Sequence, residues 1–101
     1  DEMIVVRGVN AFPSVVAAAV NACTELNGEY RIRLAHPPPY DRLPLEVELL
    51  HDQAPNDDLY ETIRQRLADT LRLGVALTLL PSGTLERTEG KTRRLIKDYR
   101  Q

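Results

Sequence analysis

The sequence predicts an α+β fold of the ferredoxin-like type, a βαββαβ sandwich in which two helices cover one face of an antiparallel sheet. Alternating apolar and charged residues indicate two adjacent strands, at residues 28–36 and 43–50. Apolar residues at helical spacing follow Pro13 and the acidic pair Asp57–Asp58. A chain of 101 residues can bury one core. We therefore assign residues 1–101 to a single domain.

The first two elements are a strand and a helix. MIVVRG, residues 3–8, is a β-branched run closed by a glycine and is typical of a strand. Pro13 suits the first turn of a helix. The pattern predicts that this helix continues to Asn27–Gly28, with one apolar stripe made of Val16, Val20 and Cys23.

The two alternating strands are expected to pair antiparallel. Arg31 and Arg33 interrupt the apolar residues of the first strand, and Glu46 and Glu48 interrupt those of the second. Antiparallel pairing would place the arginines opposite the glutamates on the solvent side of the sheet. The connection contains three consecutive prolines, residues 37–39, which we expect to keep it out of the sheet.

A second helix and a last strand complete the predicted core. Asp58 and Glu61 have the spacing of a capping box. An apolar stripe then runs to Gly74, through Leu59, Ile63, Leu67 and Leu71. VALTLL, residues 75–80, supplies the fourth strand. The remaining residues are expected to form a basic C-terminal tail outside the core.

Charge and cysteine content limit the function classes. The formal net charge is -2, but residues 87–101 carry six basic and two acidic side chains. Cys23 is the only cysteine, so no disulfide is possible within the chain, and a cytoplasmic location is the default. No apolar run is long enough to span a membrane, and no signal sequence is evident. The chain opens on DEMIVVRG without an initiating Met, and we expect it to be part of a longer protein.

Most candidate site residues have an ordinary structural explanation. His36 and His51 lack further ligands at metal spacing, so no metal site is predicted. Cys23 fits core packing, and Asp57–Asp58 fits helix capping. Gly8 fits a turn between a strand and a helix, although a glycine also allows a ligand to approach the backbone closely. Neither a Walker motif nor a GxGxxG loop is present.

The basic tail has two interpretations. A solvated helix end accounts for most of its charges, which belong to Arg93, Arg94, Lys97 and Arg100. It does not account for Gly90–Lys91, because glycine breaks a helix. A lysine on a mobile turn is suited to supply a positive charge to a site built by another domain.

Read together, the two ends of the chain resemble the C-terminal lid domain of adenylate-forming acyl-CoA ligases, in particular the phenylacetate-CoA ligase group. DEMIVVRGVNAFPS, residues 1–14, is similar to the family's hinge-and-strand motif, and EGKTRR, residues 89–94, is similar to its motif with the catalytic lysine. The resemblance extends from Asp1 to about Arg100. It implies a larger enzyme that uses Mg²⁺-bound ATP and coenzyme A as co-substrates, neither of which binds to this domain alone.

The resemblance also implies roles for individual residues. Lys91 matches the lysine inserted during adenylation, Asp1 matches the hinge acid, and Gly8 and Asn10 match positions along the coenzyme A channel. Supporting roles fall to Arg7, Gly90, Arg93 and Arg94. The implied partners are an N-terminal adenylation domain of the same polypeptide and a small carboxylic acid, with an aromatic acid as the expected class. No nucleic acid or membrane partner is implied, and the isolated domain is expected to be inactive.

Two other functions remain open for a ferredoxin-like domain. A nucleic-acid-binding module needs exposed aromatic residues on the sheet, whereas the alternation places arginines and glutamates there. A stand-alone small-molecule sensor that dimerises through its sheet is the other possibility. Binding measurements with RNA and a mass measurement in solution distinguish these functions from a lid domain.

Overall fold

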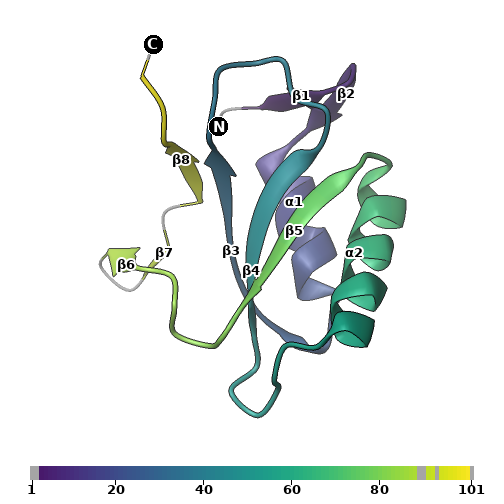
Figure 1. The fold of residues 1–101 in the computed structure, drawn as a ribbon, viewed down its shortest axis with the longest axis vertical. Helices are drawn as coiled ribbons and strands as arrows, with labels where there is room; N and C mark the ends of the chain where they lie inside the picture. Colours follow the sequence, from purple (N-terminus) through teal and green to yellow (C-terminus); the bar gives the residue numbers. More distant parts are fainter. Residues whose placement is uncertain (1–2, 89–90, 93, 101) are drawn as a thin grey trace.

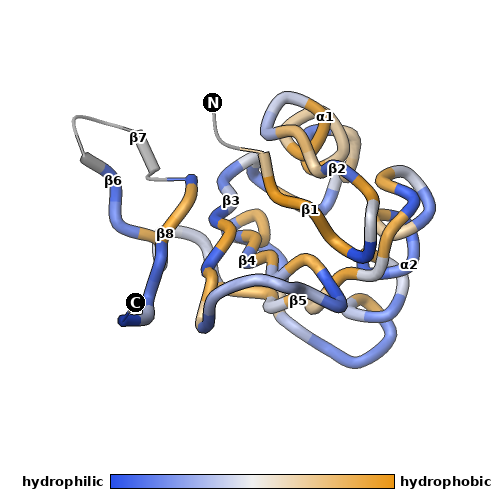
Figure 2. Tube along the Cα trace, turned by 90° about the horizontal axis from the view of Figure 1, so that it is seen from above, coloured by the Kyte–Doolittle hydropathy of each residue, from blue (hydrophilic) through white to orange (hydrophobic). Residues whose placement is uncertain are grey.

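The computed structural model describes residues 3–88, 91, 92 and 94–100, and they form a two-layer α+β domain. A four-stranded sheet in the order β5–β4–β3–β8 is covered on one face by two helices, which also contact each other (Figures 1 and 2). The predicted α+β class and its two helices are confirmed. The elements are β1 (Ile4–Val6), β2 (Val9–Ala11), α1 (Pro13–Asn21), β3 (Leu26–Leu34), β4 (Leu43–Leu49), α2 (Asp57–Leu71), β5 (Val75–Leu80), β6 (Arg87–Thr88), β7 (Lys91–Thr92) and β8 (Leu95–Lys97).

The central pair of strands is the predicted one, but the whole sheet is mixed. β3 and β4 pair antiparallel, with Arg31 opposite Glu46. β5 is parallel to β4, because α2 carries the chain back across the sheet, and β8 is parallel to β3. The prediction of a fully antiparallel sheet was therefore wrong for both edge strands.

The two ends of the chain differ from the predicted order of strands. Residues 4–6 do not enter the four-stranded sheet, because the chain turns at Arg7–Gly8 and pairs β1 with β2 in a hairpin. The free edge of β3 is taken by β8, whose Leu95 packs against the core. Part of the basic tail thus belongs to the sheet, and the prediction that the tail lies outside the core was wrong for this part.

The first helix begins as predicted and ends early. Pro13 occupies the start of α1, where a missing N–H leaves no hydrogen bond unmade. The helix ends at Asn21, and turns at Cys23 and Leu26 lead into β3. Asn27 and Gly28 belong to an irregular stretch of β3 where the pairing with β4 shifts. Gly28 has φ +91°, and a Cβ there would lie 2.8 Å from the Asn21 side chain.

The second helix has the predicted apolar stripe and a different cap. Asn56 precedes α2, and its side-chain oxygen accepts a hydrogen bond from the Leu59 N–H at 2.8 Å. Glu61 pairs with Arg64 instead of closing a capping box. The predicted box at Asp58 was therefore wrong by two residues, because Asn56 is better placed to satisfy the first free N–H groups.

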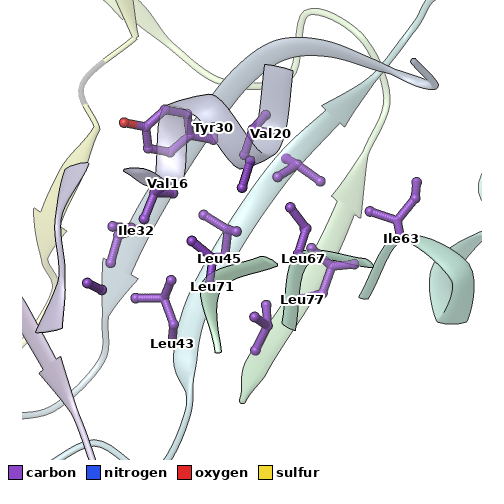
Figure 3. Packing of buried hydrophobic residues seen from close by; sticks show 14 of the residues in the cluster. Val16, Val20, Tyr30, Ile32, Leu43, Leu45, Ile63, Leu67, Leu71 and Leu77 are labelled. Atoms are coloured by element: carbon purple, nitrogen blue, oxygen red, sulfur yellow. The ribbon is translucent and has the colours of Figure 1, made fainter. Parts of the chain in front are cut away.

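The core lies between the helices and the sheet (Figure 3). Cys23 belongs to it, which confirms that this cysteine fills core space, and burial raises the pKa of its thiol. No helix among the described residues combines the length and apolarity that crossing a bilayer requires. Figure 3 labels ten of the core side chains, Val16, Val20, Tyr30, Ile32, Leu43, Leu45, Ile63, Leu67, Leu71 and Leu77.

Truncation of the α2 stripe tests this packing. Leu67 is 1% exposed, so Leu67→Ala should lower the free energy of unfolding by about 2–5 kcal/mol. Thr70 lies in the same helix and is exposed, and Thr70→Ala should change the free energy by no more than about 0.5 kcal/mol. Urea denaturation measures both variants. Equal losses would contradict the assigned orientation of α2.

Candidate functional site

The turn between β1 and β2 places Gly8 at the surface. Val6 pairs with Val9, so Arg7 and Gly8 form a two-residue loop, with φ +48° and +81° as in a type I′ turn. The expected turn between a strand and a helix is thus a hairpin turn. A Cβ on Gly8 would meet no atom within 4 Å. The backbone at Gly8 is therefore open to a group from outside the domain.

The outward face of this hairpin is part amide and part apolar. Asn10 lies opposite Val5 in the register, and both side chains are exposed. Met3 and Phe12 are 43% and 48% exposed. The inner face is held in place, because Val6 forms a bridge with Tyr40 and the Arg7 N–H donates to the Tyr40 carbonyl at 3.2 Å. The hairpin is thus a fixed platform with an uncovered outer surface.

The backbone of Lys91 lies in a second, separate hairpin. Thr88 of β6 pairs with Lys91 of β7, and Arg87 pairs with Thr92. The predicted site residues Asp1, Gly90 and Arg93 lie outside the described residues. The helix end considered for this segment is replaced by short strands in the described part of the tail.

A buried carboxylate binds the backbone of the segment that leads to this hairpin. Glu48 of β4 is fully buried and is the only buried charged side chain among the residues described. Its Oε1 accepts hydrogen bonds from Asn27 Nδ2 at 2.8 Å, the Gly83 N–H at 2.8 Å and Arg87 Nη2 at 2.9 Å. Its Oε2 accepts from the Leu85 N–H at 2.6 Å. The solvent position predicted for Glu48 was wrong, because residues 81–87 cross this part of the sheet and cover it (Figure 1).

The pKa of Glu48 is lowered despite its burial. Burial by itself raises the pKa of a carboxyl group. The hydrogen bonds from Asn27, Gly83, Leu85 and Arg87 favour the charged form and outweigh burial. Glu48 therefore remains an anion at neutral pH.

Glu29 of β3 connects two arginines on either side of Lys91 in the sequence. Arg87, the first residue of β6, places Nε 3.3 Å from Glu29 Oε2. We call the β6–β7 hairpin, residues 87–92, the lysine hairpin. Arg94, after it, places Nη1 3.1 Å from Glu29 Oε1. Arg94 Nη1 also donates a hydrogen bond to the Tyr30 carbonyl at 3.1 Å. The Arg94 Cζ lies 4.4 Å from the centroid of the Tyr30 ring, in a cation–π contact. Arg94 is thus engaged within the domain, in contrast to the solvated charge considered from the sequence.

The pairing predicted for the central strands is present for one of the two glutamates. Arg31 Nε lies 2.5 Å from Glu46 Oε1, on the sheet face away from the helices. Arg33 Nη1 lies 4.0 Å from Glu46 Oε2, and Arg33 Nη2 lies 2.6 Å from Asp98 Oδ2. These ion pairs occupy the face that a nucleic-acid-binding sheet would need for stacking.

The remaining candidates show ordinary structural roles. His36 is exposed and its Nδ1 lies 2.7 Å from the Pro37 carbonyl. Asp57 and Asp58 lie in the first turn of α2, where negative charge is favourable. Across the described part of the chain, no group of three or more His, Cys, Asp or Glu side chains is arranged to hold a metal ion.

The fold does not bring Gly8 and Lys91 together. Figures 1 and 2 place the β1–β2 hairpin and the β6–β7 hairpin on opposite sides of β3. The two hairpins therefore present separate surfaces of the domain.

Residues 8–100 match the family model of the AMP-binding enzyme C-terminal domain. The chain is 30% identical over 118 aligned positions to the phenylacetate-coenzyme A ligase of Thermus thermophilus, an alignment that covers 100% of this chain and 26% of that protein. The chain thus spans about a quarter of the length of this curated relative.

Two solved structures of 2-hydroxyisobutyryl-CoA ligase have a similar domain. The first is in the postadenylation state, with TM-score 0.81, 31% identity and coverage of 97% of this chain and 22% of that one. The second is in the thioesterification state, in complex with 2-HIB-AMP and CoA, with TM-score 0.76, 31% identity and coverage of 97% and 21%.

The lowered pKa of Glu48 leads to a prediction about acid stability. A carboxyl group with a lowered pKa contributes stability above its unfolded pKa, about 4.3, and loses that contribution as the pH falls through the folded pKa. Glu48→Gln cannot titrate, so its free energy of unfolding should fall less steeply below about pH 5 than that of the unmodified domain. At neutral pH it should be lower by about 2–4 kcal/mol, because an amide leaves buried donors unmatched. Urea denaturation at several pH values measures both effects, and parallel curves would contradict the assignment.

Proposed function

Because the chain belongs to the family of AMP-binding enzyme C-terminal domains, we propose that residues 1–101 are the mobile lid of an ATP-dependent, AMP-forming acyl- or aryl-CoA ligase. The partner of the lid is an N-terminal adenylation domain of the same polypeptide. That domain binds Mg²⁺-bound ATP and a small carboxylic acid, for which an aromatic acid is the candidate because the relative described above is a phenylacetate-coenzyme A ligase. The isolated lid is inactive, because it lacks these binding sites.

Lys91 acts in the first half-reaction. The substrate carboxylate attacks the α-phosphorus of ATP, and pyrophosphate leaves to give an acyl-adenylate. This step forces two anionic groups together and spreads charge over the phosphoryl oxygens. A lysine ammonium placed between them stabilises the transition state as a compact point charge. Support for this role comes from the family match, which includes residue 91, and from the backbone of Lys91, which lies in a hairpin outside the four-stranded sheet.

The β1–β2 hairpin acts in the second half-reaction. The thiol of coenzyme A attacks the acyl carbonyl, and AMP leaves. Gly8 and Asn10 line the path of the pantetheine arm, and Arg7 supports the same turn. The open space at Gly8 supports this assignment, because a side chain there would project into the path and not into the domain.

The observation that carries the proposal is the separation of the two hairpins (Figures 1 and 2). One domain presents Lys91 in one pose and Gly8 in the other, and Asp1 absorbs the rotation between them as a hinge. The postadenylation and thioesterification states of 2-hydroxyisobutyryl-CoA ligase support such an exchange in the family. Closure in two alternative poses lets one active site run two reactions in turn.

Removal of the lysine should separate the half-reactions. Lys91→Ala in the full-length ligase should lower the rate of acyl-adenylate formation by about 10²–10³-fold, as expected for loss of a preorganised charge donor. Thioester formation from a preformed acyl-adenylate should change little. Lys97 is the only other lysine in the chain, and Lys97→Ala is the matched control, expected to leave both rates unchanged. Equal losses in both half-reactions of Lys91→Ala would refute the assigned role.

A side chain at Gly8 should have the opposite effect. Gly8→Ala should lower the rate of thioester formation and spare adenylation, because its Cβ enters the coenzyme A path. Gly83 has φ +87° and an equally open Cβ position, so Gly83→Ala imposes comparable backbone strain away from that path. The two half-reactions are measured by pyrophosphate release and by thioester formation from synthetic acyl-adenylate. Loss of thioester formation in both variants would assign the effect of Gly8 to strain alone.

A further inference from the structure

The burial of Glu48 is costly unless its charge is fully matched. An ionised carboxylate in the interior loses the hydration that stabilises it in water. Four donors at 2.6–2.9 Å replace that hydration, and two of them are backbone N–H groups of the segment between β5 and β6. The carboxylate therefore holds the backbone of Gly83 and Leu85 against β4. The segment that leads to the lysine hairpin cannot leave the sheet without exposing or unpairing this charge.

The same network reaches the far end of the hairpin. Arg87 joins Glu48 to Glu29, and Glu29 joins Arg87 to Arg94, with one carboxylate oxygen facing each arginine. The residues of this network, Glu48, Arg87, Glu29 and Arg94, are named the hairpin clamp. Lys91 lies between its two arginines in the sequence, so both ends of the lysine hairpin are tied to the central strands.

An irregularity in β3 makes the clamp possible. The pairing of β3 with β4 shifts between Leu26 and Tyr30, and Gly28 adopts φ +91° there. Within this stretch, Asn27 donates to Glu48 and accepts from the Glu29 N–H at 2.9 Å. The Asn27 amide therefore ties Glu48 to the backbone of Glu29. Glu48 lies between Leu49 and Val47, the partners of Leu26 and Tyr30, so the shift places both Asn27 and Glu29 at the level of Glu48.

We propose that Glu48 is a positioning residue for adenylation, which holds the lysine hairpin at a fixed place on the domain through the hairpin clamp. The inference rests on the proposed role of Lys91. When the domain closes in its adenylation pose, the ammonium group must arrive within a fraction of an ångström of the reacting oxygens, and a misplacement of about 1 Å costs about 10²-fold in rate. A hairpin of two-residue strands cannot hold such a position by its own backbone pairing. The clamp supplies the missing constraint.

The test uses the full-length ligase and measures the two half-reactions separately. Glu48→Gln should lower acyl-adenylate formation by about 10–100-fold and leave thioester formation from preformed acyl-adenylate within about twofold. Arg94→Gln removes the far end of the clamp at a partly exposed position, so it should act in the same direction without the folding penalty of a buried change. Measurements are made well below the unfolding midpoint of each variant.

Glu46→Gln is the matched control. Glu46 lies on the same strand, two residues from Glu48, and is also paired with an arginine, Arg31. Glu46 is bound by Arg31 and Arg33 of β3 and belongs to none of the clamp contacts described above, so both half-reactions should be unchanged.

A double-mutant cycle separates positioning from general folding. If Glu48 acts through Lys91, Glu48→Gln should cause no further loss of adenylation in a Lys91→Ala background. Proportional losses in both half-reactions, or a full additional loss in that background, would overturn the proposal. Wild-type adenylation in both clamp variants, with adenylation lost in Lys91→Ala, would also overturn it and leave the proposed function standing. Intact adenylation in Lys91→Ala itself would overturn both.

Discussion

The path of the chain between β5 and the lysine hairpin depends on one buried carboxylate. Glu48 is held charged by four hydrogen bonds, and two of them fix a loop that would otherwise have no regular partner. The contact holds this loop on β4, and the chain continues from it through the β6–β7 hairpin to β8, which pairs with β3 (Figure 1). The C-terminal segment is part of the architecture for this reason, although its composition is that of a solvated tail.

The opposite side of β3 presents a hairpin with a different surface. The Tyr40 carbonyl accepts a hydrogen bond from the Arg7 N–H and holds the β1–β2 turn on the domain. Gly8 in this turn has a positive φ, and no other atom of the domain lies within 4 Å of the position that a Cβ would take. The domain therefore carries two hairpins on opposite sides of β3, one rich in basic residues and one part amide and part apolar (Figures 1 and 2). Such a body suits a lid that exchanges one element for the other at the same active site, as we propose.

Local sequence patterns predict the parts of this fold that depend on local contacts. Period-two alternation gives β3 and β4 with their register at Arg31 and Glu46, and helical periodicity gives the stripe of α2. Alternation also places Glu48 on the outward face correctly, but it cannot show that a distant segment returns to cover that face. The β1–β2 hairpin escaped detection because Arg7, a residue that rarely adopts positive φ, shares the turn with Gly8. β8 escaped because its parallel pairing is non-local, and no short pattern specifies it. The roles proposed for Gly8 and Lys91 rest on resemblance to the family motifs, whereas the contacts of the hairpin clamp can be seen only in the folded structure.

Hydrogen–deuterium exchange on the full-length ligase tests most directly whether the two hairpins take turns at one site. The backbone of residues 87–92 should gain protection with the acid and a non-hydrolysable ATP analogue, while residues 5–10 stay exchangeable. With an acyl-adenylate analogue and coenzyme A, the protection should reverse between the two segments. Simultaneous protection of both hairpins in either complex would contradict the exchange of poses, and so would protection of the same hairpin in both complexes.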